Sequence, residues 1–316
     1  MPHPAWPHIA VLGAGAVGCY FGGMLARAGA PVTLIGRPAF VGAAADGLLL
    51  DTLKFQQRVA VRASTEISAL RGAAIVLLAV KTLDTETAAK ELAPHLAPGA
   101  TLISLQNGVD NVERIRAATG IEAIATVVYV AAAMSAPAHV KHSGRGDLVT
   151  GIFPQGGPET GARWQRLHEL ADIFQRAEIP CRVSANIRAE LWTKLIINCA
   201  YNAISALCLA RYGRVLQNTG TRELMRRVTE EALAVARAAG VELAAPQMVE
   251  SVYKLGEAMP QALSSTAQDI ARGKRTEMDS LNGYLVRCGQ NLGVDVPVKQ
   301  TLYSLMKLRE DSLERN

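Results

Sequence analysis

The order of apolar and polar residues predicts two kinds of structure along this chain. Up to about residue 183, short apolar runs alternate with helical patterns, which is typical of β-α-β units in a parallel sheet. Beyond Asn186 the strand signals end and helical patterns continue to the end of the chain. We therefore predict an α/β domain with a Rossmann-type doubly wound sheet over residues 1–184, and an all-α domain over residues 185–316.

Individual elements follow from the same pattern. Apolar runs of strand length predict strands at 9–12, 31–35, 48–50, 58–62, 74–80, 101–105 and 180–183. Residues 124–153 favour further strands, with turn residues at 143–146. Helical periodicity predicts helices over 84–96, 162–177, 186–207, 221–239 and 275–292.

The first predicted strand runs directly into a glycine motif, and a helical pattern closing at Gly29 follows it. In a dinucleotide site the first glycine makes a tight turn, the second admits the pyrophosphate, and the third packs the helix on the strand. The helix N-terminus then binds the pyrophosphate. Strand, motif, helix and second strand together predict a Rossmann nucleotide site. Its motif consists of Gly13, Ala14, Gly15, Ala16, Val17 and Gly18.

The end of the second strand indicates which dinucleotide binds. Sites that prefer NAD place an acidic residue about 20 residues after the glycines, where it binds the ribose 2′-hydroxyl. This chain has no Asp or Glu between Gly18 and Asp46, and Arg37 stands at the strand end instead. An arginine there pairs with a 2′-phosphate, although a solvated loop arginine is the alternative. We predict NADP(H).

Two further strand ends carry polar residues where a doubly wound sheet places ligand contacts. Lys81 follows the apolar run at 74–80, and it is either a cofactor contact or a polar strand terminus. Asn107 follows the strand at 101–105. Asn-Gly is also an ordinary turn sequence, but its position beside the expected cofactor crevice favours a binding role for Asn107.

The predicted helix at 186–207 is apolar around most of its circumference, which indicates a buried helix. One polar row runs through it at four-residue spacing, a spacing that places side chains on one face. A solvent-exposed Glu-Lys pair explains the first two positions but not two further asparagines. Because unsatisfied buried polar groups cost about 1–3 kcal/mol, we interpret the row as a ligand-binding face. Its members are Glu190, Lys194, Asn198 and Asn202.

Composition supports an enzyme-sized globular chain. The 316 residues are 49% hydrophobic and 19% charged, and the net charge of +5 has no cluster that indicates nucleic-acid binding. The longest apolar run, 73–80, is too short to span a bilayer, and the N-terminus lacks the pattern of a secretion signal. Five cysteines without a C-x-x-C pair indicate reduced thiols in a cytoplasmic protein. We expect no metal, no membrane partner, and a monomer or homodimer.

Two other residues have simple structural interpretations from the sequence alone. Ser265 and Gln268 fit a capping box at the start of a helix. Glu277 follows Thr276, a possible helix cap, and fits a first-turn carboxylate that the helix dipole favours.

Over nearly its whole length the chain resembles the ketopantoate reductases. The glycine motif is common to many dehydrogenases, so three other segments carry the resemblance. They are Gln106-Asn107-Gly108, the helix segment Trp192–Asn202, and Ser264-Ser265-x-x-Gln268-Asp269 with Arg275-Thr276-Glu277-Met278-Asp279-x-x-Asn282-Gly283.

This resemblance implies an N-terminal domain that binds NADPH and a helical domain that closes over a 2-oxo acid. It implies that Lys194 is the catalytic lysine and Glu277 its acidic partner. Substrate positions fall on Asn198, Asn202 and Ser265, and cofactor positions on Arg37, Lys81 and Asn107. An ammonium suits ketone reduction because it polarises the carbonyl and then donates a proton to the oxygen.

The substrate is less well determined than the reaction. Reduction of 2-dehydropantoate to pantoate is the first hypothesis. An NADP-dependent dehydrogenase of another small 2-oxo or 3-hydroxy acid, a catalytically silent NADP(H) sensor and an opine-type dehydrogenase are alternatives. The combination of Lys194, Asn198, Asn202 and Glu277 disfavours the sensor.

Overall fold

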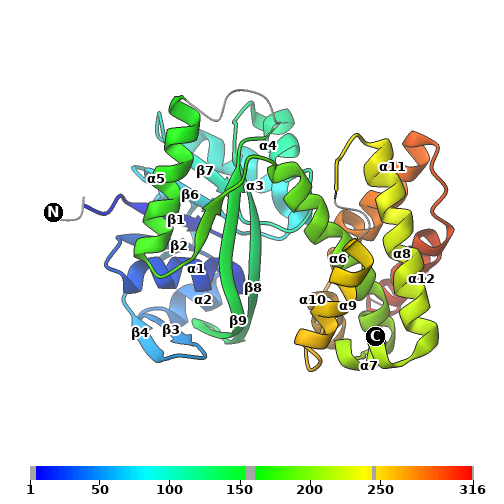
Figure 1. Cartoon of the computed structure of the whole chain (residues 1–316). Coiled ribbons are helices and arrows are strands. Elements are labelled where there is room, and N and C mark those ends of the chain that lie inside the picture. The colour runs from blue at the N-terminus through cyan, green and yellow to red at the C-terminus, as the bar shows by residue number, and fades with distance from the viewer. Residues whose placement is uncertain (1–4, 154–160, 244–246, 315–316) are drawn as a thin grey trace. The chain divides into compact units, whose positions relative to one another are not determined.

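The computed structural model describes residues 5–153, 161–243 and 247–314 (Figure 1). Its contacts divide the chain into two units, Met1–Arg188 and Ala189–Asn316. The first unit contains a large sheet with helices, and the regular elements in the described part of the second are all helices. This arrangement confirms the predicted fold class.

Ten strands of the described residues form one mixed sheet in the first unit. They are β1 (Ile9–Leu12), β2 (Val32–Ile35), β3 (Leu48–Asp51), β4 (Gln56–Val59), β5 (Arg62–Ser64), β6 (Ile75–Leu78), β7 (Thr101–Ser104), β8 (Ile124–Ala136), β9 (His139–Gly151) and β10 (Cys181–Val183). Their order is β4-β3-β9-β8-β7-β6-β1-β2-β5, and β10 pairs with β9.

The centre of the sheet is parallel, and β1 lies between β2 and β6. The chain passes from β1 to β2 on one side and returns to β6 on the other. In doubly wound sheets such a reversal opens a crevice at the carboxyl ends of the strands. All four residues of β1, β2 and β6 are buried, as expected for strands covered on both faces.

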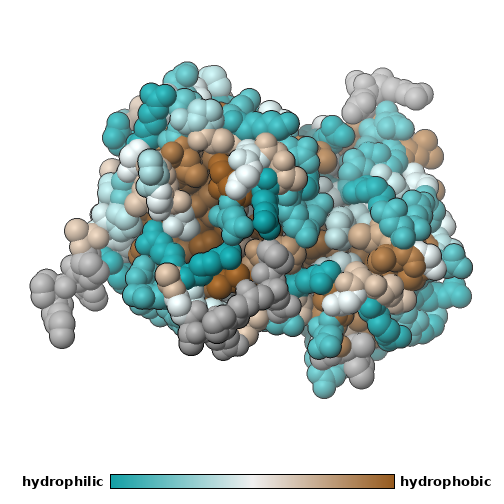
Figure 2. Space-filling model, turned by 90° about the horizontal axis from the view of Figure 1, so that it is seen from above, coloured by the Kyte–Doolittle hydropathy of each residue, from teal (hydrophilic) through white to brown (hydrophobic). Residues whose placement is uncertain are grey.

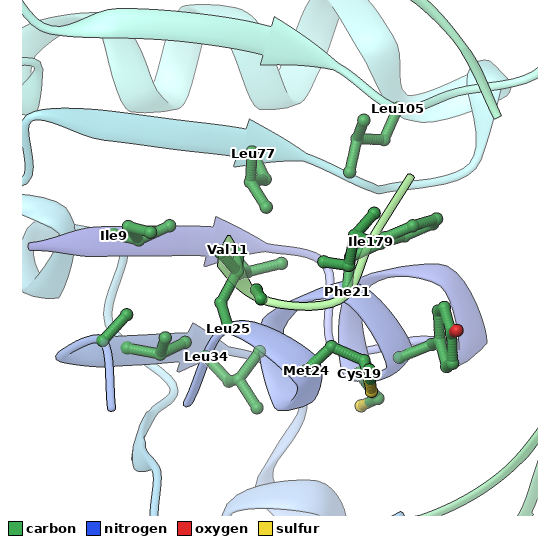
Figure 3. Packing of buried hydrophobic residues seen from close by; sticks show 14 of the residues in the cluster. Ile9, Val11, Cys19, Phe21, Met24, Leu25, Leu34, Leu77, Leu105 and Ile179 are labelled. Atoms are coloured by element: carbon green, nitrogen blue, oxygen red, sulfur yellow. The ribbon is translucent and has the colours of Figure 1, made fainter. Parts of the chain in front are cut away.

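Helices cover both faces of this sheet (Figure 1). They are α1 (Ala16–Arg27), α2 (Pro38–Ala43), α3 (Thr85–Leu92), α4 (Asn111–Thr119) and α5 (Ala162–Arg176), with 3₁₀ turns η1 (Ile67–Leu70), η2 (Thr82–Asp84) and η3 (Ala93–His95). Side chains of α1 and α5 share one buried cluster with the sheet. Figure 3 shows Val11 and Leu34 of the strands next to Leu25 of α1. Each such burial contributes roughly 1.5–3 kcal/mol.

Two details of the predicted sheet were wrong. The single strand expected at 58–62 is two strands, because β4 pairs with β3 at one edge and β5 pairs with β2 at the other. The turn expected at 143–146 lies inside β9, where the pairing with β8 shifts register. The chain reverses instead at Ala138, which has φ +52°. Gly146 (φ +144°) therefore serves a bulge and not a hairpin turn.

The second unit consists of helices in its described part. They are α6 (Ile187–Cys208), α7 (Tyr212–Gln217), α8 (Thr219–Ala238), α9 (Met248–Ala258), α10 (Ser265–Ala271), the 3₁₀ turn η5 (Met278–Ser280), α11 (Asn282–Leu292) and α12 (Pro297–Glu314). Tyr201 of α6 is fully buried and donates a hydrogen bond to the carbonyl of Val252 at 2.8 Å. Glu231 of α8 caps α12 by accepting the N–H groups of Val298 and Lys299, both at 2.9 Å.

The visible face of the molecule is mostly hydrophilic, with smaller hydrophobic patches between the polar side chains (Figure 2). Within the described ranges, none of the helices combines the length and hydrophobicity needed to cross a bilayer. The five cysteines are free thiols.

Candidate functional site

The turn between β1 and α1 is formed by close packing of main chains. A Cβ atom at Gly13 would lie 2.6 Å from the carbonyl carbon of Ala79, and Gly13 itself has φ +109°. A Cβ at Gly18 would lie 2.1 Å from the carbonyl oxygen of Gly13. The carbonyl of Ile35 accepts the N–H groups of Gly13 and Ala14 at 3.0 and 3.1 Å. Glycine is thus required at positions 13 and 18 by the fold itself.

Gly15 is different, because neither its neighbours nor its backbone requires glycine. Apart from its two chain neighbours, no described residue has an atom within 4 Å of a Cβ placed there, and its φ of −88° is ordinary. It is the N-cap of α1, and it has no side chain with which to cap the free N–H groups. The first turn of α1 has no acidic residue. An exposed helix N-terminus with open space at Gly15 fits the pyrophosphate of a dinucleotide.

Arg37 lies at the end of β2, next to this turn. A Cβ at Gly36 would lie 2.6 Å from the Cβ of Ala14, so the two loops are in contact. Arg37 is exposed and precedes α2, and the described residues form no ion pair or side-chain hydrogen bond with it. Its guanidinium is therefore available for an anionic group of a ligand, such as a 2′-phosphate.

Lys81 follows β6 and Asn107 follows β7, and a hydrogen bond joins the two loops that carry them. Thr82, the neighbour of Lys81, donates from Oγ1 to the carbonyl of Asn107 at 2.6 Å. Asn111 donates from Nδ2 to the same carbonyl at 2.7 Å. Lys81 is exposed and Asn107 is half-buried. Both residues therefore lie at the carboxyl edge of the sheet that also carries Gly13.

The polar row predicted on α6 is partly or fully buried. Glu190, Lys194 and Asn198 are half-buried, and Asn202 is only 2% exposed. The amide Nδ2 of Asn202 has no hydrogen-bond partner among the described residues. An unsatisfied buried amide costs about 1–3 kcal/mol, which a bound polar ligand offsets. Their roles toward a substrate stay predictions.

The capping role expected of Ser265 belongs to its neighbour. Ser264 is the N-cap of α10, and its Oγ accepts the N–H of Ala267 at 3.0 Å. Gln268 donates to the carbonyl of Leu263 at 3.1 Å instead of completing a box. Ser265 is exposed at the first position of α10, so the helix does not need its hydroxyl as a cap.

Glu277 does not open a long helix as expected. It precedes the 3₁₀ turn η5, and Leu281 (φ −107°, ψ −92°) separates that turn from α11. Glu277 is half-buried, and its predicted pairing with Lys194 stays a prediction. Residues on both sides of Glu277 contact α12. On one side, the hydroxyl and the N–H of Thr276 both donate to Glu310.

Asp279 makes the second contact of this segment with α12. Its carboxylate accepts hydrogen bonds from Tyr303 Oη at 2.6 Å and Lys307 Nζ at 3.2 Å. Partial burial alone raises the pKa of this carboxyl, but these hydrogen bonds, with the charges of Lys307 and Arg275, outweigh it. The pKa of Asp279 therefore lies below its usual value.

Several buried polar residues were not predicted from the sequence to be site residues. Asn282 is fully buried, and neither amide atom has a hydrogen-bond partner among the described residues. Lys299 is also fully buried, and burial lowers the pKa of its amine. Thr82 and Asn111 lie beside predicted site residues but look like ordinary helix-start residues. Thr82 and Asn107 are 25 positions apart, so no local spacing reveals their contact. No cluster of potential metal ligands occurs in the described residues.

Known proteins are similar to this chain over most of its length. A family model described as "Ketopantoate reductase PanE/ApbA" matches residues 9–155, and its C-terminal counterpart matches residues 186–310. The 2-dehydropantoate 2-reductase of Pyrococcus abyssi is 34% identical over 303 residues, which cover 96% of this chain and 97% of that protein.

Solved structures show the same similarity. The crystal structure of a PanE/ApbA family ketopantoate reductase from Ralstonia eutropha JMP134 is 47% identical, with a TM-score of 0.90 over 97% of this chain and 99% of that one. A ternary structure of D-mandelate dehydrogenase with NADH and anilino(oxo)acetate has a TM-score of 0.88 at 22% identity, covering 97% of this chain and 99% of that one. At this identity the likeness is one of fold.

The contrast between Gly15 and Gly18 leads to a first prediction. Gly18→Ala should destabilise the protein by roughly 1–3 kcal/mol, because the new methyl group overlaps a carbonyl oxygen. Gly15→Ala should leave the melting temperature nearly unchanged but weaken dinucleotide binding, measured by quenching of protein fluorescence. Equal destabilisation by the two substitutions would show that the fold, and not a ligand, requires glycine at position 15.

The contacts of Asp279 lead to a prediction about pH. Because its folded pKa lies below the unfolded value, its stabilising effect is present above about pH 4 and is lost as the pH falls through the folded pKa. Asp279→Asn should therefore lower the melting temperature at pH 7, and the difference from wild type should shrink below about pH 4. The matched control is Asp311→Asn, an exposed position on α12, the helix that Asp279 contacts. A pH-independent difference for Asp279→Asn would contradict this account.

Proposed function

Because the chain belongs to the ketopantoate reductase family, a family of oxidoreductases, we propose that it reduces a 2-oxo acid with NADPH. The first candidate substrate is 2-dehydropantoate, which would be reduced to pantoate. The single observation that best supports a polar ligand beside Lys194 is the buried, unsatisfied amide of Asn202 on the same helix face.

The first unit supplies the groups that suit NADPH. Main-chain N–H groups from Gly15 to Gly18 bind the pyrophosphate at the N-terminus of α1. Arg37 binds the 2′-phosphate, since no acidic residue stands at the end of β2 to repel it. Lys81 and Asn107, at the ends of the next two strands, contact the cofactor. When bound, NADPH supplies the hydride that reduces the ketone carbon.

Lys194 supplies the proton. As an ammonium group it polarises the ketone oxygen, stabilises the negative charge that develops there, and transfers a proton to it. Glu277 orients the amine and holds the positive charge close to the oxygen. The contacts of Thr276 and Asp279 with α12 fix the main chain on both sides of Glu277, which keeps that carboxylate in place.

Neutral polar groups bind the acid without adding charge near Lys194. Asn198 lies one helical turn beyond Lys194 on α6, and Asn202 one turn further. Their amides donate to carboxylate and hydroxyl oxygens of the substrate. Ser265 adds a hydroxyl from the start of α10, where the capping role of Ser264 leaves it available.

The proposed function is tested with a panel of 2-oxo acids, each supplied with NADPH whose absorbance reports turnover. We expect 2-dehydropantoate to be the best substrate of the panel, and Lys194→Ala to lower kcat by about 10²–10⁴-fold while NADPH still binds. The matched control is Lys254→Ala, an exposed lysine of α9 that pairs with Glu250. If Lys194→Ala kept more than about a tenth of the wild-type kcat, the barrier would have risen by less than ~1.4 kcal/mol, and Lys194 could not be the acid.

Arg37 determines the expected choice of cofactor. Arg37→Asp should weaken NADPH binding by at least 10-fold, corresponding to about 1.4 kcal/mol, because a carboxylate replaces the phosphate's cationic partner. NADH binding should change little, since NADH lacks the 2′-phosphate. Dissociation constants for both cofactors are measured side by side, and Arg71→Asp, an exposed position that precedes β6, controls for net charge. Equal losses for the two cofactors would contradict the assignment.

A further inference from the structure

A network of buried polar side chains lies behind the loops that carry Lys81 and Asn107. We name it the loop network. Each member is at most 5% exposed, although polar residues are usually at the surface. The members are Thr82, Thr85, Ser104, Gln106 and Asn111.

The hydrogen bonds of the network form a continuous chain. Ser104 Oγ donates to Gln106 Oε1 at 3.0 Å, and Gln106 Nε2 donates to Thr85 Oγ1 at 2.7 Å. The Thr85 hydroxyl lies within donating distance of the Thr82 carbonyl (2.8 Å) and of Asn111 Oδ1 (3.0 Å). Fully satisfied buried networks hold their members rigidly, because any displacement leaves a buried group unpaired.

This chain ends on a single atom, the carbonyl oxygen of Asn107. Thr82 Oγ1 and Asn111 Nδ2 both donate to it, at 2.6 and 2.7 Å, so both of its lone pairs are used. The peptide plane after Asn107 is thereby fixed from two directions. Gly108 follows with φ +99°, a conformation that lets the chain turn sharply at this point.

We propose that Thr82 and Asn111 are positioning residues, which act through the main chain of Asn107 to aim its side chain at the cofactor and the reacting carbon. Neither residue needs to touch a ligand. This inference rests on the proposed function only in taking Asn107 as a ligand-contacting residue.

The same contacts join Asn107 to Lys81. Thr82 directly follows Lys81, and its main-chain carbonyl accepts a hydrogen bond from Arg114 Nη1 at 3.0 Å. Arg114 is held in turn by Glu86 of α3 at 3.0 Å. The loops after β6 and β7 thus move as one body, and one misplaced hydroxyl displaces both ligand-contacting residues.

A structural role alone would lower stability and leave kinetics unchanged, so the test needs a readout that separates the two roles. We use a double-mutant cycle between Thr82→Val and Asn107→Ala, read out as kcat/KM for the 2-oxo acid and as the dissociation constant of NADPH. Small displacements of reacting groups cost up to about 10²-fold, so Thr82→Val should lower kcat/KM by about 10-fold or more. In the Asn107→Ala background the same substitution should cost less than about twofold, because the side chain it positions is gone.

Three further variants complete the design. Thr82→Ser keeps the hydroxyl and should restore most of the lost activity. Asn111→Ala removes the other donor and should show the same coupling to Asn107→Ala, which keeps the test valid if Thr82→Val fails to fold. Thr33→Val is the matched control, because Thr33 is a buried threonine of the same unit whose hydroxyl bonds to His8 Nε2 at 2.9 Å near the amino end of β1. It should lower the melting temperature without changing kcat/KM.

The possible outcomes are distinct. Coupling between Asn107 and the two donors supports the positioning role, whereas equal effects of Thr82→Val in both backgrounds would overturn it. If no 2-oxo acid is reduced, the proposed function fails, but the cycle on NADPH binding still decides the role of Thr82 and Asn111. Coupled losses of NADPH affinity then support positioning, and independent losses refute it.

Discussion

The site depends on one close contact, that between the main chain of the β1–α1 turn and the main chain that follows β6. Gly13 packs against Ala79 at a separation that excludes any Cβ, and Gly18 packs still more closely on Gly13. This contact brings the N-terminus of α1 to the carboxyl edge of the sheet at the point where the strand order reverses. Gly15, Arg37 and Lys81 all lie at this edge of the sheet. A bulkier turn would move the N-terminus of α1 away from the edge at which we propose that the cofactor binds.

Two sets of buried polar groups lie near the predicted site residues, and they differ in their hydrogen bonding. In the first unit, the side chains behind Asn107 bond to one another in a continuous chain. In the second, Asn202 and Asn282 have buried amide groups without hydrogen-bond partners among the described residues. A satisfied network makes a rigid support, while unsatisfied groups favour the binding of a polar ligand. We propose that the first set supports the cofactor loops and that the Asn202 amide binds the polar substrate.

Hydrophobic patterning determined most of the fold. The continuous apolar runs of β1, β2 and β6 predict buried parallel strands, and the family matches over residues 9–155 and 186–310 confirm the resemblance read from the motifs. Hydrophobic patterning predicted the strands less accurately where glycines resemble the residues of a turn. Glycines at 144 and 146 look like a hairpin turn, yet they lie in β9, because pairing with β8 continues past them through register shifts. A bulge and a turn have the same local composition, and only the partner strand distinguishes them.

The sequence alone determined which residues are candidates for chemistry, since the glycine spacing, Arg37 without a nearby acid, and the polar row of α6 are all local patterns. The tertiary structure decided how those residues are supported. It moved the helix cap from Ser265 to Ser264, bound the flanks of Glu277 to α12, and joined Thr82 to Asn107 across 25 positions of sequence. The contacts of Thr276 with Glu310 and of Thr82 with Asn107 pair residues that only the path of the fold brings together. Local spacing describes one element at a time, and therefore cannot identify a partner that another element supplies.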